Sequence, residues 1–165
     1  SSFSNNVAIT PGAFSTASKD LTALSNPINI EFRVVDASSN IYRFLPTASG
    51  AYQDDVDGKL YFFASASAVN TVVSNLASKI NGVSGLGLTV NAATGVISFT
   101  GSISSSAYNG YVFQTGSGTS FSTQATLGGG VNGSGGVAFV LSTIAASNTA
   151  TCVSVIWSMT NAVSP

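Results

Sequence analysis

Three carboxylates stand close together in the segment Asp54-Asp55-Val56-Asp57-Gly58, which makes it the first candidate for a metal site. Calcium prefers clustered oxygen ligands of this kind. An EF-hand loop with its glycine at Gly58 would need ligands at both ends of the frame, where the chain has Gln53 and Ala64, so that pattern fails. Two interpretations stay open: a looser calcium site formed by the three carboxylates, and a solvent-exposed hairpin turn at Asp57-Gly58.

The run from Gly128 to Gly133 matches the spelling of a dinucleotide-binding loop, G-x-G-x-x-G. That loop works only between a strand and a helix, with an acidic residue about 20 positions further on. Neither the helix nor the acidic residue is present in the sequence that follows. The glycines are therefore expected to permit a loop or a close approach of two backbones, and no cofactor is expected.

The sequence lacks the partner residues that a catalytic nucleophile needs. The chain has no histidine, which excludes a Ser-His-Asp or Cys-His arrangement, and no serine stands in a G-x-S-x-G context. A serine paired with Lys19, Lys59 or Lys79 remains conceivable, but nothing in the spacing selects one. We therefore expect that the protein is not an enzyme. Asn132-Gly133-Ser134 fits the glycosylation sequon, which matters only in a eukaryotic secretory route.

Aromatic residues with nearby amides offer a second kind of site. Stacking of sugars on aromatic rings is usually reinforced by amide or charged groups that bind hydroxyls. The residues that could form such a platform are Tyr108, Asn109, Tyr111 and Gln114. Glycan binding, as in an adhesin, is the alternative function; packing in a core or an interface is the use we favour for these rings.

The distribution of charge is unusual. Charged residues make up 7% of the chain, against about 25% in ordinary soluble domains, and the net charge is -1. All of them lie between Lys19 and Lys79, so everything from Ile80 to Pro165 is uncharged. Two interpretations stay open: Ser, Thr and Asn side chains cover an exposed exterior, or much of the exterior is buried against other copies, which we favour. The low charge also argues against a nucleic-acid partner, which needs a basic patch, and no apolar run is long enough to predict a membrane partner.

The first 27 residues are predicted to form an extended N-terminal arm. Pro11-Gly12 and Asn26-Pro27 interrupt this segment, and its apolar residues follow no period. Such an arm would lie along the protein's own body or along a neighbouring subunit; an ordinary irregular terminus is the open alternative. The candidate assembly-interface residues in it are Phe3, Val7, Ile9, Phe14, Leu21 and Leu24.

Residues 28–165 are predicted to form a single β-rich domain: mainly β (α+β), an antiparallel, sandwich-like sheet with one helix packed on it. Alternating apolar residues predict hairpins over 28–45 and 86–100, and a second hairpin turning at Asp57-Gly58. Apolar residues at spacings of three and four predict an amphipathic helix over about 67–81, capped by Ser65 or Ser67. Further strands are expected over 137–144 and 151–159.

Part of this order resembles a known module. A strand from Lys59, the helix ending at Asn81, the strand pair 87–100 and the segment Leu127 to Asn132 are similar to a small β-rich module of tailed-bacteriophage virion proteins. The same elements resemble the "IN" module of flagellar hook-associated proteins. Those proteins also have long heptad-patterned terminal helices, which this chain lacks, so the virion resemblance is favoured.

The resemblance implies a structural subunit of a phage particle, in the capsid decoration or the tail. Its partners would be other copies of the chain, as a homo-oligomer, or other virion proteins, and its location would be the virion. A subunit of a pilus-type filament or a surface layer would have much the same composition, with an extracellular location. The resemblance brings no catalytic residue with it.

Overall fold

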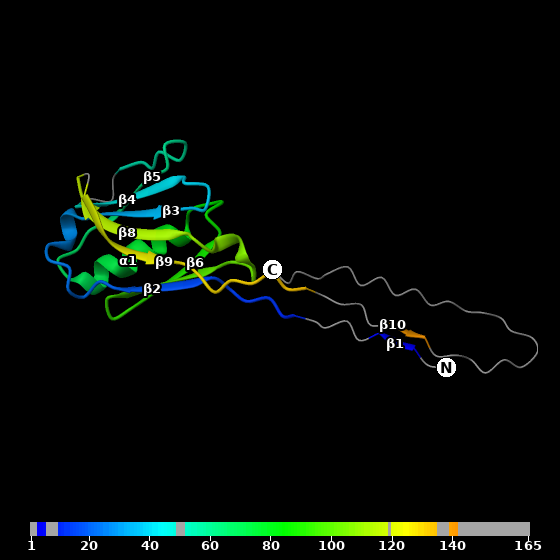
Figure 1. The fold of residues 1–165 in the computed structure, drawn as a ribbon. Helices are drawn as coiled ribbons and strands as arrows, with labels where there is room; N and C mark the ends of the chain where they lie inside the picture. The colour runs from blue at the N-terminus through cyan, green and yellow to red at the C-terminus, as the bar shows by residue number, and fades with distance from the viewer. Residues whose placement is uncertain (1–2, 6–9, 49–51, 119, 135–138, 142–165) are drawn as a thin grey trace, which may run out of the picture.

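The computed structural model describes residues 3–5, 10–48, 52–118, 120–134 and 139–141. The fold is mainly β, and the described residues contain one α-helix, as the sequence predicts. Two sheets and the helix form a body, and two extended segments leave it side by side at one end (Figure 1). The elements of the body are β2 (Thr16–Asp20), β3 (Glu31–Val35), β4 (Ile41–Thr47), β5 (Leu60–Ala64), α1 (Val69–Asn81), β6 (Leu88–Ala93), β7 (Val96–Gly101), β8 (Val112–Ser117) and β9 (Ser120–Thr126), with short 3-10 turns η1 (Pro27–Asn29) and η2 (Ser106–Tyr108).

The larger sheet has five strands in the order β5-β4-β3-β8-β9. β3 and β4 form the first predicted hairpin, in which Phe32 stands opposite Phe44. The turn before β5 also forms, because Asp55 pairs antiparallel with Leu60. The second predicted hairpin is nevertheless wrong as a strand pairing: β5 runs parallel to β4, with Phe44 opposite Tyr61. The sheet is therefore mixed rather than wholly antiparallel.

The smaller sheet has three strands in the order β2-β7-β6. β6 and β7 form the predicted hairpin, turning at Thr94 and Gly95, which both have positive φ. The helix α1 contacts this sheet and β5. Of the predicted stripe, Val69 is half-buried and the other five residues are buried: Val72, Val73, Leu76, Ala77 and Ile80. The N-cap of α1 differs from the prediction, since Ala68 holds that position and no side chain caps the helix there.

Aromatic side chains join the two sheets. Phe32 and Phe113 of the larger sheet stack with ring centroids 6.0 Å apart, and Phe113 lies 4.8 Å from Phe99 of the smaller sheet. All three rings are essentially inaccessible to solvent. Such buried ring pairs contribute stability beyond the area that they bury. The core is therefore continuous from one sheet to the other.

The N-terminal arm is shorter than predicted. Residues 16–20 form β2, an edge strand that pairs with β7 along its whole length, and Leu21 is 1% exposed in the core. β2 is not predicted from the sequence, because Thr-Ala-Ser-Lys-Asp carries no large apolar side chain to mark a buried face. The body therefore begins by residue 16 rather than 28. The strands predicted over 137–144 and 151–159 lie largely outside the described residues, apart from β10 (Phe139–Leu141).

Two edge strands are bonded by side chains near the helix. On β5, Asp54 accepts a hydrogen bond from the Phe62 N–H, and Asn75 donates one to the Ala64 carbonyl. On β6, the Asn81 amide donates to the Val90 carbonyl and accepts from its N–H. Unpaired edges invite pairing with other chains, so these contacts block the two edges beside α1.

Candidate assembly interface

Two segments far apart in the sequence pair with each other outside the body. We call residues 10–16 together with residues 128–134 the ribbon. Isolated antiparallel bridges join Thr10 to Ser134 and Ala13 to Val131, and a third joins Thr16 to Gly128. Each bridge has both backbone hydrogen bonds, with lengths of 2.9–3.1 Å. Further along the same two segments, β1 (Phe3–Asn5) pairs antiparallel with β10 (Phe139–Leu141), away from the body (Figure 1).

A set of small polar residues fastens the ribbon to the body. The Ser15 hydroxyl is fully buried and lies 2.8 Å from Asn109 Oδ1 and 3.1 Å from the Ser105 carbonyl oxygen. The Asn109 amide donates to the Gly130 carbonyl and accepts from its N–H, both at 2.9 Å. Ser15, Ser105, Asn109 and Gly130 form what we call the polar clamp. A buried polar group that loses its hydrogen bond costs free energy. Moving either ribbon strand would break hydrogen bonds of the clamp, so the clamp keeps both strands in one position.

Gly130 is required by this close approach. A Cβ atom at that position would overlap with Ser15 Oγ and with the Ser105 carbonyl oxygen. The glycine run therefore permits a contact between backbones, as the sequence predicts. Gly128, two positions earlier, has open space where a Cβ atom would stand.

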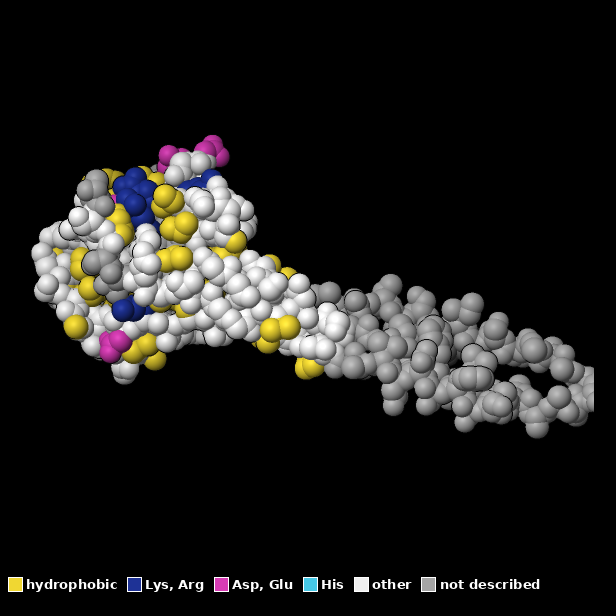
Figure 2. All heavy atoms as spheres, in the orientation of Figure 1, with side chains coloured by type: hydrophobic (Ala, Val, Ile, Leu, Met, Phe, Trp, Pro, Cys, Tyr) yellow, Lys and Arg dark blue, Asp and Glu magenta, His cyan; other side chains and the backbone are white. Residues whose placement is uncertain are grey.

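The root of the ribbon exposes apolar side chains on both faces. Phe14 is 47% exposed and Val131 is 45% exposed. Val131 pairs with Ala13, and neighbouring residues of a strand point to opposite faces, so Phe14 and Val131 lie on different faces. Figure 2 shows the root as white and yellow spheres, without the blue or magenta of charged side chains. Residues 1–18 and 80–165 contain no charge, so no titratable side chain belongs to the ribbon.

The six arm residues that the sequence nominated have different positions. Phe14 lies at the ribbon root and is exposed, so its nomination stays a prediction. Leu21 belongs to the protein's own core, so its prediction as an interface residue is wrong. Leu24 is half-buried against that core. Phe3 lies in β1, where its backbone pairs with Leu141. The side chain of Phe3, and Val7 and Ile9 altogether, lie outside the described residues.

The four glycan candidates do not form one platform. Tyr108 and Tyr111 make an edge contact with centroids 5.3 Å apart, and both pack against the core. Tyr108 also lies against Gly87 and Gly101, where a Cβ atom would overlap with its ring. The Asn109 amide is occupied in the polar clamp. Gln114 stands opposite Arg33 on the outer face of the larger sheet, away from the core that the two tyrosines contact.

The acidic segment 54–58 has structural contacts instead of a common centre. Asp54 binds the Lys79 ammonium and the Phe62 N–H, while Asp55 accepts from the Gly58 N–H in the turn. Burial would raise the pKa of Asp54, but these two donors outweigh it and hold the pKa below its usual value. Among the described residues, no three carboxylates, histidines or cysteines group as a metal site would need. The exposed turn is therefore the interpretation that fits Asp54, Asp55 and Asp57.

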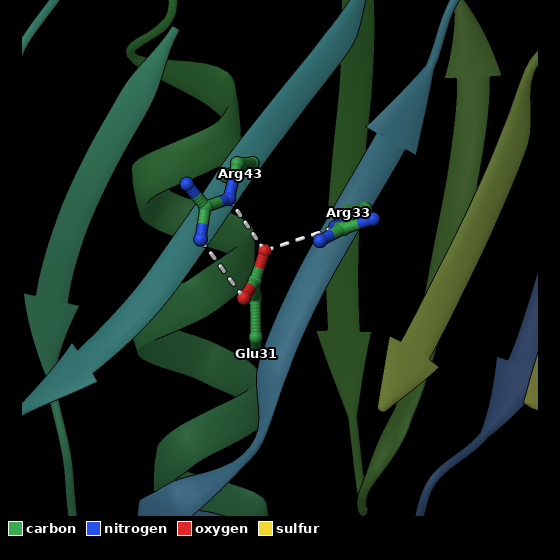
Figure 3. A network of polar contacts seen from close by, with 3 residues as sticks. All are labelled: Glu31, Arg33 and Arg43. Atoms are coloured by element: carbon green, nitrogen blue, oxygen red, sulfur yellow. Dashed lines mark hydrogen bonds and ion pairs between the residues drawn. The ribbon is translucent and has the colours of Figure 1, made fainter. Parts of the chain in front are cut away.

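Three further charged residues form a network on the outer face of the larger sheet. Glu31 accepts hydrogen bonds from Arg33 Nε at 2.9 Å and from Arg43 Nε at 2.7 Å (Figure 3). The Arg33 guanidinium also lies 3.6 Å from the centre of the Phe121 ring. Burial would raise the pKa of Glu31, but the two arginines outweigh it and hold the pKa below its usual value. The charges of this network satisfy one another within the body.

The polar clamp has no recognisable pattern in the sequence. Serine is so common in this chain that Ser15 and Ser105 carry no signal of their own. The one available hint was the Asn-Gly dipeptide at 109–110, which is typical of a turn. Spacing alone does not show that its amide binds a backbone 21 positions away.

Comparison of the chain with protein-family models, with curated proteins and with solved structures finds no match. No helix in the described ranges combines the length and the apolar composition that crossing a membrane requires. The geometry of the ribbon and its surroundings is therefore the basis for a functional proposal.

Proposed function

We propose that this protein is a structural subunit that associates with other copies of itself through the ribbon. The single observation that carries the proposal is the ribbon root, an uncharged pair of extended segments with Phe14 and Val131 exposed on opposite faces. An isolated two-stranded unit is marginal in water, because it buries little apolar surface and leaves both backbone edges unpaired. A neighbour that covers these faces and edges would remove both costs.

A second copy is the occupant that fits this surface. The ribbon carries no charge, so it offers nothing to select an acidic or a basic partner. Its neutral faces, and the backbone groups at its edges that the polar clamp does not bind, are complementary to those of an identical ribbon related by a two-fold axis. Asp54, Asn75 and Asn81 bind backbone groups of the edge strands β5 and β6, which makes these two edges less available to another chain than the ribbon.

The resemblance to virion modules makes a bacteriophage particle the setting that we propose, with a pilus-type or surface-layer filament as the alternative. Both settings need many copies held by repeated contacts, and neither needs a catalytic centre. Mass spectrometry of purified phage particles from the source of the sequence would decide between them. Recovery of the chain from filaments instead would retain the assembly and reject the virion.

Sedimentation of the full chain over a range of concentrations tests the assembly itself. We expect association that persists at high salt, because contacts between neutral apolar surfaces are not screened by ions. The double variant Phe14→Ser with Val131→Ser should shift the protein toward monomer. Ile28→Ser is the matched control, since Ile28 is 42% exposed but lies away from the ribbon. A wild-type protein that stays monomeric at high concentration would overturn the proposal.

A further inference from the structure

The chain contains three Asn-Gly dipeptides, at 81–82, 109–110 and 132–133, and the structure treats them differently. Asparagine before glycine is the sequence most prone to form a succinimide, because glycine has no Cβ atom to hinder attack by its own nitrogen. The reaction needs a free side-chain amide and a free glycine nitrogen. Hydrogen bonds to either group therefore protect the dipeptide.

In two of the dipeptides, the asparagine side-chain amide and the glycine N–H both donate hydrogen bonds. Asn81 Nδ2 donates to the Val90 carbonyl at 2.6 Å, and the Gly82 N–H donates to the last turn of α1. Asn109 Nδ2 donates to the Gly130 carbonyl at 2.9 Å, and the Gly110 N–H donates to the Leu127 carbonyl at 2.8 Å. Solvent exposure does not predict which dipeptide is protected, because Asn81 is exposed to solvent and its side-chain amide is still hydrogen-bonded.

The third dipeptide lies in the ribbon, and only its asparagine Oδ1 takes part in hydrogen bonds. Asn132 Oδ1 accepts hydrogen bonds from the Ser106 N–H at 3.0 Å and from its hydroxyl at 3.3 Å. Within the described part of the chain, neither Asn132 Nδ2 nor the Gly133 N–H has a hydrogen-bond partner. The opposing strand carries Pro11 at this level, which interrupts the ladder between the Thr10 and Ala13 bridges.

We propose that Asn132 is a site of spontaneous deamidation that loosens the ribbon as the protein ages. The Gly133 nitrogen loses its proton to a base and bonds to Cγ of Asn132; the Cγ–Nδ2 bond then breaks, and the nitrogen leaves as ammonia after taking up a proton. The Ser106 donors stabilise the negative charge that develops on Oδ1. Water then opens the ring at either carbonyl, leaving an aspartate or an isoaspartate at position 132.

The product changes the ribbon in two ways. A negative charge enters a part of the chain that otherwise has none. An isoaspartate also lengthens the backbone by one methylene between the Val131–Ala13 and Ser134–Thr10 bridges, so both bridges cannot keep their register. Loss of assembly on ageing rests on the proposed function, whereas the chemistry at position 132 does not.

Incubation of the folded full chain at mildly alkaline pH, followed by peptide mass mapping, tests the chemistry. We expect a gain of about one dalton at Asn132 at a rate at least about tenfold above Asn81 and Asn109, because a lost hydrogen bond is worth roughly that factor. Methylation by an isoaspartyl methyltransferase should label the same peptide. The urea-unfolded chain is the control, and there all three sites should react at similar rates.

Two variants separate the chemistry from its consequence. Gly133→Ala should slow the change at position 132, while Asn132→Asp should install the charge without the longer backbone and keep the Ser106 contact. Aged wild-type protein should then lose association beyond the loss seen with Asn132→Asp. Equal rates at the three sites in the folded chain, or reaction at Asn81 or Asn109 before Asn132, would overturn the inference whether or not the protein assembles.

Discussion

The body and the ribbon are held by different kinds of contact. In the body, aromatic rings from two sheets meet in a buried core, Glu31 pairs with two arginines and Asp54 with Lys79, and side chains near the helix bind the backbone of two edge strands. In the ribbon, backbone bridges and a few hydroxyl and amide groups hold the strands, while apolar side chains remain exposed. The difference teaches that stability and association can be separated by experiment: we expect the body to determine whether the chain folds, and we propose that the ribbon determines what it contacts.

The largest effect should come from the core. Phe113→Ala removes the ring that contacts both Phe32 and Phe99, and we expect a loss of about 3–5 kcal/mol in the free energy of unfolding. The comparison variant Phe14→Ala removes an exposed ring of the ribbon and should alter the free energy of unfolding by less than about 0.5 kcal/mol. Urea denaturation of dilute protein measures both. Equal losses would show that the ribbon is part of the folding unit.

The next effect should come from the polar clamp. Gly130→Ala forces a Cβ atom against Ser15 and the Ser105 carbonyl, and we expect a cost of about 1–3 kcal/mol. Limited proteolysis should then cut near residues 10–16 while the body stays intact. Gly128→Ala is the matched control, because open space surrounds the added atom. If both variants resist proteolysis equally, the clamp does not hold the ribbon.

A smaller effect should follow from opening an edge of the body. Asn81→Ala removes both side-chain hydrogen bonds to the Val90 backbone, and we expect a loss of about 1–2 kcal/mol together with salt-resistant aggregation through β6. Ser74→Ala, on an exposed position of the same helix, should change neither property. Light scattering of both variants measures the aggregation. An Asn81 variant as soluble as wild type would mean that this contact does not protect the edge.

The smallest effect concerns pH. The pKa of Glu31 is lower in the folded protein than its ordinary value of 4.5, so its contribution to stability is present above that value and is lost as the pH falls through the folded pKa. Because Arg43 is 42% exposed, solvent screening limits the contribution to less than about 1 kcal/mol. Glu31→Gln should flatten the fall in stability between neutral and acidic pH, as followed by denaturation. Association through the ribbon should not change over the same range, since it contains no titratable side chain.

Sequence alone predicted the parts of this fold whose side chains repeat with a clear period. The stripe of α1 and the alternation in β6 and β7 both mark a buried face, and both elements formed where expected. β2 has no such pattern, because β7 holds it mainly through the backbone. The parallel pairing of β4 with β5 depends on how the chain returns after the loop, which no local pattern records.

The candidate site was predictable in kind but not in detail. Phe14 was nominated because it is a large apolar residue in a segment without period, and it is exposed at the ribbon root. Leu21 shares both properties, yet it fills the core, because the strand before it pairs with β7 and carries it inward. Position in the assembled sheet, rather than residue type, decides between the two outcomes.

The long sequence separation across the ribbon has a consequence for the order of folding. Thr10 pairs with Ser134, so the first strand of the ribbon must wait for almost the whole described chain before its partner exists. Contacts between such distant residues form late, because a long loop has to close first. During synthesis the larger sheet and the helix can therefore fold before the ribbon is complete. Under the proposed function, a nascent chain on the ribosome would lack its means of association until residue 134 has been made, which would keep neighbouring nascent chains on the same message apart.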